Sequence, residues 1–418
     1  MRTYHHTIHF LRTYGIKHAF MYRAFIMIFF WSIFDGILTY ILPLLISEHG
    51  FSKSEMGMIL GSSSFAGAVF DIVVSKYLKT PHYRKLYASV FILSFSFLGI
   101  LYFASTVWIF LLAMAVWGIY WDLFHFANFD FISRTTPEKE HSSSFGIQGI
   151  FHSLGILIAP IIAGLLIETT IDSKPFIVSG WMLFLSIIVY IGLWIQSKKR
   201  EEISAKPVQR STDWKHEYKI WLMITKQLAP VLVLTFLIYI TDAFFWTIGP
   251  LIAEHGEFGK FGGFLLAAYS FPSLIIGWFV GTISNRFGKK RTAVYSFLIG
   301  SCVLSLFMFV KEPISMIVLV SIASSCIGLS FPALNGAYAD YIFETQIYEK
   351  EIQGIVDFFY NIGWMIGPML AGILAQIFGN AESFSILAIF CAGVSIILVL
   401  KMPRKIRLKV PAPRGCGI

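Results

Sequence analysis

The segment Asp35–Gly50, with the sequence DGILTYILPLLISEHG, recurs in the second half of the chain as Asp242–Gly256, DAFFWTIGPLIAEHG. The two acids are 207 residues apart, as are Pro43 and Pro250, and the Glu-His-Gly endings are 206 residues apart. Both segments lie in long apolar runs, so each copy carries an acid inside a stretch long enough to span a membrane. A doubled multi-helix membrane unit with a matching acid in each half indicates a transporter built from two bundles.

The match between the halves extends beyond this segment. It includes Gly57-Met58-Ile59-Leu60 with Gly263-Phe264-Leu265-Leu266, Arg84-Lys85 with Lys290-Arg291, and Gly155, Pro160 and Gly164 with Gly363, Pro368 and Gly372. Such a repeat predicts two pseudo-symmetric six-helix bundles. We expect an N-terminal segment 1–20, a first bundle 21–196, a cytoplasmic linker 197–221, a second bundle 222–402 and a basic tail 403–418.

The composition is that of an integral membrane protein. Hydrophobic residues make up 56% of the chain, charged residues make up 14%, and the mean hydropathy is +0.70. In a soluble domain, about a quarter of the residues are charged. We therefore predict an all-α integral membrane fold with twelve transmembrane helices of roughly 20 residues or more. They are expected at about 22–47, 54–78, 86–104, 107–132, 143–167, 176–196, 222–252, 261–284, 292–310, 314–341, 350–377 and 383–401.

The formal net charge of +9 indicates an orientation in the membrane rather than a nucleic-acid partner. With both termini in the cytoplasm, 29 of the 33 Lys and Arg residues fall at cytoplasmic ends or loops. The other four are Lys53, Lys174, Lys260 and Lys311. This distribution follows the positive-inside rule. We expect a monomeric, multi-pass protein of the cell membrane, whose partners are the lipid bilayer, a small-molecule substrate and protons.

The architecture and two motifs resemble the major facilitator superfamily. The loop after the eighth predicted span, Gly281–Arg291 (GTISNRFGKKR), is similar to the cytoplasmic G-x-x-x-D-R-x-G-R-R-R signature, with Asn285 in place of the Asp. The equivalent loop of the first half, Ser75–Lys85, keeps little beyond its basic end. Gly363–Gly372 (GWMIGPMLAG) is similar to the G-x-x-x-G-P-x-x-G-G pattern of antiporters in that family, where it marks span five rather than span eleven.

These glycines and prolines also have a physical interpretation of their own. Glycines four residues apart let helix backbones approach closely inside a membrane. An adjacent proline removes one backbone hydrogen bond and permits a bend. Tight packing and a hinge remain open alternatives for Gly155, Pro160, Gly164, Gly363, Gly367, Pro368 and Gly372.

Seven aspartates lie within the predicted spans, whereas no Lys or Arg lies deep within one. The acids are Asp35, Asp71, Asp122, Asp130, Asp242, Asp340 and Asp357. A carboxylate at mid-bilayer costs about 2.5–3.5 kcal/mol on insertion scales, so such residues usually face a cavity or a partner. Because no base lies at the same depth, we expect some of these acids to bind a proton or a cation.

Position along the spans separates candidate binding residues from the rest. Asp35 and Asp242 lie near the middle of their spans, and Asp122 and His125 share one helix face. The resemblance places spans one, four, seven and ten around a central cavity. The predicted substrate- or proton-binding residues are Asp35, Asp122, His125, Asp242 and Asp357, with the aromatic residues Trp31, Tyr239 and Trp246 beside them. The alternative is that the acids are structural and bond to Ser, Thr or backbone groups, and that the aromatic residues face lipid.

A second group of residues is expected to form a gate. Asp130 and Asp340 match across the repeat near the cytoplasmic ends of spans four and ten, where Arg84 and Arg286 are candidate partners. The resemblance implies that such contacts keep the cytoplasmic side shut. The predicted gate residues are Asp71, Arg84, Asp130, Arg286, Arg291 and Asp340.

Together these features predict a secondary active transporter that works by alternating access between two bundles. We expect proton-coupled export, that is antiport, of an amphipathic or cationic small molecule. A proton-coupled importer of a sugar or another neutral nutrient is one alternative, and a non-transporting membrane receptor or scaffold is another. The sequence contains no P-loop, metal-ligand spacing or nucleophile motif. We therefore expect neither an enzyme with catalytic residues nor a metal or cofactor site.

Overall fold

The computed structural model describes residues 19–77, 82–137, 140–167, 170–197, 214–255, 258, 261–345 and 348–401. Most of the expected segment 1–20, the linker residues 198–213 and the tail 403–418 lie outside the described residues. The described part is helical and contains no strand.

The helices follow the repeat. Those of the first half are α2 (Ala19–Glu48), α3 (Lys53–Tyr77), α4 (Tyr83–Tyr102), α5 (Val107–Thr135), α6 (His141–Leu166) and α7 (Lys174–Ser197). Those of the second half are α8 (Trp214–His255), α9 (Gly263–Phe287), α10 (Lys289–Leu304), the short 3-10 helix η3 (Phe307–Phe309), α11 (Pro313–Thr345), α12 (Glu349–Phe378) and α13 (Asn380–Lys401). Each predicted apolar range overlaps one of the α-helices, and the range 292–310 also covers η3.

The all-α membrane fold is confirmed. In the described part of the chain, ten helices are long and apolar enough to cross a membrane. The number is eleven if the two segments of α9, Gly263–Ile276 and Phe279–Phe287, which bend by 68°, form one span. α3 is not among them, since it carries Glu55, Asp71 and the polar run Gly61-Ser62-Ser63-Ser64. The exact count of twelve spans stays a prediction.

By their contacts, the described helices group into two compact units. The first unit contains α2, α4 to α7 and the part of α3 that begins at Ala66. The second contains α8 to α13 and the part of α3 that ends at Phe65. The predicted boundaries 21–196 and 222–402 stay a prediction, because α3 is divided between the units.

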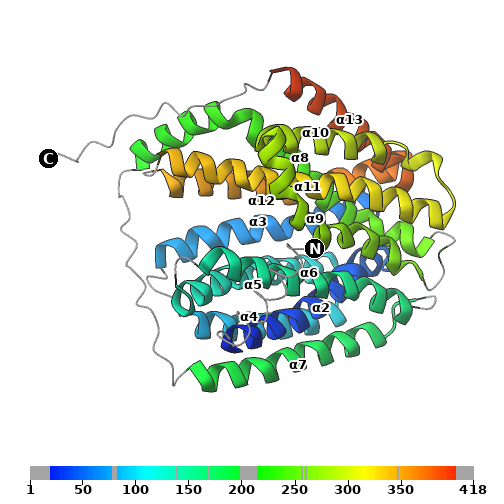
Figure 1. Ribbon diagram of the computed structural model, residues 1–418. Helices are drawn as coiled ribbons and strands as arrows, with labels where there is room; N and C mark the ends of the chain where they lie inside the picture. The colour runs from blue at the N-terminus through cyan, green and yellow to red at the C-terminus, as the bar shows by residue number, and fades with distance from the viewer. Residues whose placement is uncertain are drawn as a thin grey trace, which may run out of the picture. The chain divides into compact units, whose positions relative to one another are not determined.

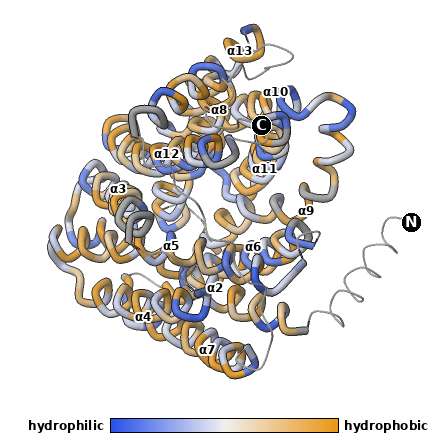
Figure 2. Tube along the Cα trace, turned by 90° about the vertical axis from the view of Figure 1, so that its left-hand side faces the viewer, coloured by the Kyte–Doolittle hydropathy of each residue, from blue (hydrophilic) through white to orange (hydrophobic). Residues whose placement is uncertain are grey.

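Both units pair their helices in the same way. In the first, α2 packs on α6 and α7, and α4 packs on α5 and α7; in the second, α8 packs on α12 and α13, and α10 packs on α11 and α13. Within the first unit, α2, α4, α5, α6 and α7 run side by side (Figure 1). Hydrophobic residues predominate along the helices of both units (Figure 2). The repeat in the sequence is therefore also a repeat in packing.

Small residues set the crossing of the first and fifth helices in each unit. An added Cβ at Gly36 of α2 would lie 2.6 Å from Cβ of Ala159 on α6. At the equivalent crossing, an added Cβ at Gly367 of α12 would lie 2.7 Å from Cβ of Ala243 on α8. Each crossing thus uses one glycine and one alanine, with the glycine on opposite partners in the two units. This close approach is what small residues provide in membrane helices.

Three of the predicted packing glycines, Gly155, Gly363 and Gly367, lie at the same crossings. An added Cβ at Gly155 would lie 2.6 Å from Cβ of Ser32, and one at Gly363 would lie 2.7 Å from Cβ of Tyr239. Pro160 and Pro368 lie inside α6 and α12, each close to its crossing. The close contacts favour tight packing for these glycines, whereas the hinge remains a prediction.

The first part of α3 belongs to the second unit because it packs on the end of α12. Lys53 Nζ donates to Ala375 O of α12 at 3.3 Å and to Asn380 Oδ1, at the start of α13, at 2.6 Å. An added Cβ would overlap the carbonyl oxygen of Pro368 if placed at Gly57, and that of Lys53 if placed at Gly372. Glycines on both helices therefore bring the two backbones together.

The first Glu-His-Gly motif ends α2. The Glu48 carboxylate accepts a hydrogen bond from Ile171 N at 3.0 Å, and His49 Nδ1 bonds to Leu45 O at 2.8 Å. Gly50 has a φ of 82°, a left-handed conformation that favours glycine. α8 ends at the equivalent histidine, and the glycine after it lies outside the described residues. The first motif is therefore a helix stop.

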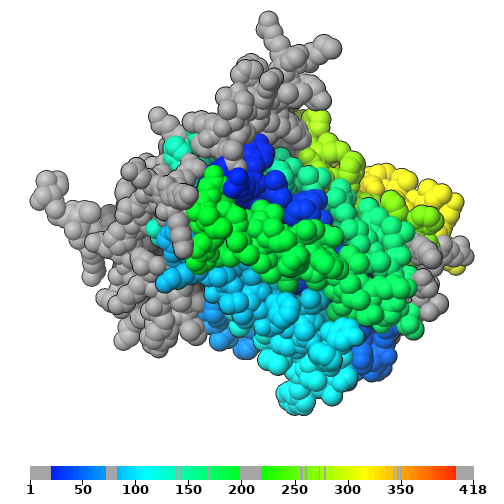
Figure 3. Space-filling view, turned by 90° about the horizontal axis from the view of Figure 1, so that it is seen from below, coloured from blue at the N-terminus to red at the C-terminus, as the bar shows by residue number. Residues whose placement is uncertain are grey.

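An apolar stripe follows α7, which lies at the surface of the first unit (green in Figure 3). Its exposed large side chains are three or four residues apart: Ile177, Trp181, Phe184, Ile188, Ile191 and Ile195. Residues with this spacing share one helix face. Such a face is expected where a helix meets lipid.

Candidate functional site

The carboxylate of Asp35 lies in the interior of the first unit, where two neutral groups on α5 bind it. The residue is 1% exposed. Its Oδ1 accepts hydrogen bonds from Tyr120 OH at 2.5 Å and from Trp117 Nε1 at 3.1 Å. Hydroxyl and indole donors stabilise a carboxylate without cancelling its charge.

Trp31 supports this arrangement from the core. It is 1% exposed, its ring stacks on Phe124 with centroids 3.9 Å apart, and its Nε1 donates to Ser94 Oγ at 3.1 Å. It also meets Tyr120 edge-on at 5.8 Å. Trp31 therefore packs against Tyr120, one of the two hydrogen-bond donors to Asp35. Its binding role stays a prediction.

Asp122 lies against the backbone of α3. An added Cβ at Gly67 would be 2.5 Å from Asp122 Oδ2, so the missing side chain of the glycine makes room for the carboxylate. Asp71, a predicted gate residue, lies one turn further along α3. The structure therefore places both acids near the contact between α3 and α5.

Two histidines flank one tryptophan beside this contact. The rings of His125 on α5 and His152 on α6 lie 5.6 Å and 5.7 Å from the ring of Trp121. His152 Nδ1 also lies 3.0 Å from Ser32 Oγ. His152 is thus a hydrogen-bonded interior residue. The binding role of His125 stays a prediction.

Asp242 of the second unit also contacts a tyrosine. Tyr269 of α9 donates from its hydroxyl to Asp242 Oδ1 at 2.8 Å. The Tyr269 ring stacks on Phe245, with centroids 3.9 Å apart and planes 12° apart. Trp246 meets the same ring edge-on at 6.4 Å. Unlike Asp35, Asp242 is only partly buried.

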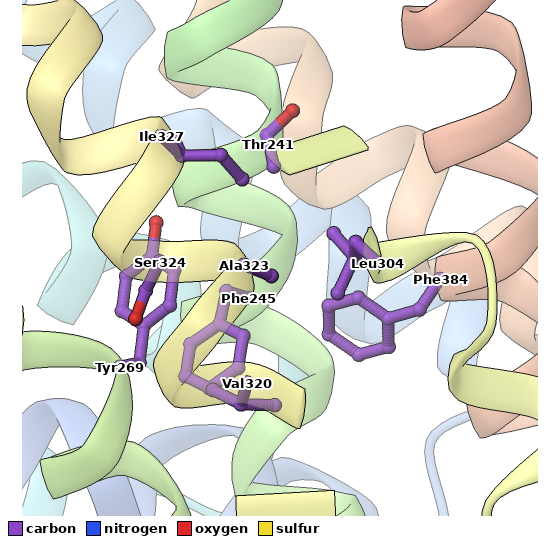
Figure 4. A pocket seen from close by; sticks show the side chains of 9 residues that line it. All are labelled: Thr241, Phe245, Tyr269, Leu304, Val320, Ala323, Ser324, Ile327 and Phe384. Carbon is purple, nitrogen blue, oxygen red and sulfur yellow. The ribbon is translucent and has the colours of Figure 1, made fainter. Parts of the chain in front are cut away.

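A small cavity adjoins this cluster (Figure 4). Its volume is about 10 Å³, and Thr241, Phe245, Tyr269, Ser324 and Phe384 are among its lining residues. This is about the space of one water molecule, so the cavity is too small for an organic substrate.

A further aromatic group joins α8, α11 and α12 in the second unit. The ring of Tyr239 lies 4.5 Å from that of Tyr360, at 87°, and 5.3 Å from that of Phe331, at 74°. The carboxylates of Asp242 and Asp357 also lie close enough to interact electrostatically with the Tyr239 hydroxyl group. The sequence predicted Tyr239 and Asp357 but missed Tyr360 and Phe331, because nothing in the sequence shows which faces of α11 and α12 meet α8.

The predicted gate acid Asp130 joins α5 to the start of α4. It accepts a hydrogen bond from Tyr83 N at 2.7 Å and pairs with Arg134, whose Nε lies 2.7 and 2.8 Å from its two oxygens. Its repeat partner Asp340 pairs with Lys289 Nζ at 2.6 Å, at the start of α10. The two acids therefore make related contacts, although Arg134 and Lys289 were not predicted. For Arg134 the spacing offered a signal, since this residue lies one turn after Asp130.

The predicted gate arginines have other contacts. Arg84 Nη2 donates to Ser197 O at 2.9 Å, at the end of α7. The guanidinium carbon of Arg286 lies 5.5 Å from the ring centre of Phe287, and Arg291 is exposed on α10. The gate role of these residues stays a prediction.

No cluster in the described part of the chain has the composition of a metal site. In those ranges, no three His, Cys, Asp or Glu side chains come together in a way that could bind a metal ion.

Comparison with known proteins identifies the family. A model of the Major Facilitator Superfamily matches residues 24–346 and 231–415, which together are most of the chain. The Quinolone resistance protein NorA of Staphylococcus aureus (strain COL) is 20% identical over 375 residues, covering 88% of this chain and 93% of that protein. The Tetracycline resistance protein, class B, of Escherichia coli is 23% identical over 280 residues, covering 66% and 67% of the two chains.

Solved structures share the fold. The crystal structure of the nucleoside transporter NupG superposes with a TM-score of 0.65 at 14% identity, covering 91% of this chain and 97% of that chain.

Proposed function

We propose that this chain exports an amphipathic or cationic small molecule in exchange for protons. The chain belongs to the major facilitator superfamily and is a multi-pass transmembrane transporter. The observation that carries the proposal is the pair of repeat-related acids, Asp35 and Asp242, each bonded to a tyrosine hydroxyl. A tyrosine hydroxyl can donate to a carboxylate and can accept from a protonated carboxyl group. Both protonation states of each acid are therefore accommodated in place.

The absence of a fixed counter-ion supports proton coupling. In the described part of the chain, no ion pair involves Asp35 or Asp242. A Lys or Arg partner would favour the charged carboxylate and oppose protonation. Neutral donors leave the negative charge of each acid available to a proton.

The relatives support the outward direction. Two of them are named for resistance to quinolones and to tetracycline. Export is the direction in which a transporter confers resistance. We further propose that both termini face the cytoplasm of the cell, in agreement with the distribution of the basic residues, and that the protein is a monomer.

Transport in reconstituted vesicles tests the proposal. The fluorescent cation ethidium is added outside vesicles whose interior is acidic. Protein molecules whose cytoplasmic side faces outward should then transport ethidium into the vesicles, where it accumulates. Collapse of the pH gradient with nigericin should abolish accumulation. Vesicles with Glu351→Gln, a carboxyl change on α12 outside the cluster around the acids, should accumulate ethidium as wild-type vesicles do. If ethidium flux is unchanged after collapse of the gradient, proton coupling is wrong.

A further inference from the structure

The seven aspartates of the predicted spans differ in the partners that the structure gives them. Asp35 and Asp242 bond to neutral donors, and Asp130 and Asp340 form ion pairs. Asp71 and Asp122 also interact with their surroundings. Asp357 makes neither a hydrogen bond nor an ion pair with any residue in the described ranges. Among these seven aspartates, it is therefore the one whose charge is left for a group that is not part of these units.

The position of Asp357 supports this reading. Its side chain is exposed on α12, eight residues after Glu349, the start of the helix. At 1.5 Å per residue, this is about 12 Å along the helix, within the range expected to cross the membrane. An exposed carboxylate at such a depth does not face lipid, because lipid offers it neither water nor a counter-charge. This face of α12 therefore lines a path open to water or to a ligand.

Aromatic rings lie on the same side of the second unit. Tyr360 follows Asp357 by three residues, so the two share one face of α12. The Tyr360 ring meets Tyr239 at 4.5 Å, and Tyr239 meets Phe331 at 5.3 Å. Gly363 allows this arrangement, because an added Cβ there would lie 2.7 Å from Cβ of Tyr239. The close crossing of α8 and α12 thus brings rings from three helices together.

We propose that Asp357, Tyr360, Tyr239 and Phe331 form a binding site for an organic monocation within the second unit. The carboxylate supplies the counter-charge, and the aromatic faces attract a cation that carries apolar groups. This proposal deepens the proposed function, on which it rests, by assigning the substrate's charge to Asp357. Asp35, which is 1% exposed and whose Oδ1 already accepts two hydrogen bonds, is too buried for that contact.

Binding to the purified full-length chain tests this site without requiring transport. The probe is tetraphenylphosphonium, and its neutral counterpart is triphenylphosphine oxide, which has three of the same rings. Wild type should bind the cation saturably. Asp357→Asn should weaken that binding at least tenfold, Asp357→Glu should restore most of it, and the weaker binding of the neutral compound should not change.

The rings have a smaller, separable effect. Tyr360→Leu should weaken tetraphenylphosphonium binding about two- to fivefold, the range of a single cation–π contact, whereas Tyr360→Phe should not. Glu351→Gln, which removes one carboxylate from the same helix, serves as the control and should bind as wild type. Thermal unfolding and gel filtration identify variants that are misfolded, and the Tyr360 pair remains informative if Asp357→Asn does not fold.

Two results would overturn the site. One is the absence of saturable tetraphenylphosphonium binding by wild type, and the other is wild-type affinity in folded Asp357→Asn. Failure of the proposed function would look different, because Asp357-dependent binding would persist in a protein whose flux ignores the pH gradient.

Discussion

Asp35 and Asp242 occupy equivalent positions of the repeat but have different surroundings. Asp35 is buried and bonds to Tyr120 and Trp117 of α5, whereas Asp242 is partly exposed and bonds to Tyr269 of α9. The two acids have kept a tyrosine partner but take it from helices that are not equivalent in the repeat. At the scale of single residues, the two halves have therefore diverged.

This difference predicts unequal effects on stability. Asp35→Asn replaces the acceptor of two charge-assisted hydrogen bonds in a buried site, which should cost about 1–3 kcal/mol. Asp242→Asn affects one such bond and should cost about half as much. The midpoints of thermal unfolding in detergent measure the difference. An equal or smaller loss for Asp35→Asn would contradict the assigned hydrogen bonds.

The partners of the acids show where sequence reasoning stops. The acids were found because a charged residue in an apolar run is conspicuous in any sequence. Trp117, Tyr120 and Tyr269 were missed because they lie on other helices, in runs where aromatic residues are common. Lys289 of α10 was missed as the partner of Asp340 for the same reason, whereas Arg134 lies one turn after Asp130 on α5 and could have been found from its spacing.

At the scale of elements, both units repeat the crossing of the first and fifth helices. The sequence predicted packing or a hinge at Gly155 and Gly363, because they match across the halves, but not which helix faces them. The structure adds that a neighbouring glycine–alanine contact is reversed between the units. The first helix carries the glycine in one unit, with Gly36 against Ala159, and the alanine in the other, with Ala243 against Gly367. Spacing within one helix cannot show such an exchange, which requires knowledge of the facing helix.

Alanine substitutions test these crossings. Gly155→Ala and Gly363→Ala each place a Cβ within 2.7 Å of a facing Cβ, so the helices must separate. We expect a loss of about 1–3 kcal/mol for each, as for other overpacked positions. Gly192→Ala on α7 is the control, since a Cβ there meets nothing within 4 Å. Comparable unfolding midpoints for all three variants would contradict the close crossings.

At the scale of the whole molecule, periodicity and apolar length predicted where the helices lie, because both are local properties of the chain. They did not predict that α3 is shared between the two units or that α9 bends by 68°. The sharing of α3 depends on glycines of two helices that are distant in the sequence, Gly57 and Gly372. Such a contact becomes visible only when both helices are placed.

The central claim is that the movement of substrate and the movement of protons are one exchange that uses Asp35 and Asp242. Proton movement driven by substrate alone tests it most directly. Vesicles reconstituted with the chain, loaded with the pH dye pyranine and prepared without a pH gradient, receive an ethidium gradient. The wild type should move protons against the flow of ethidium, and Asp35→Asn and Asp242→Asn should lose this movement while remaining folded. Ethidium flux through the wild type without proton movement, or normal proton movement in both variants, would contradict the account.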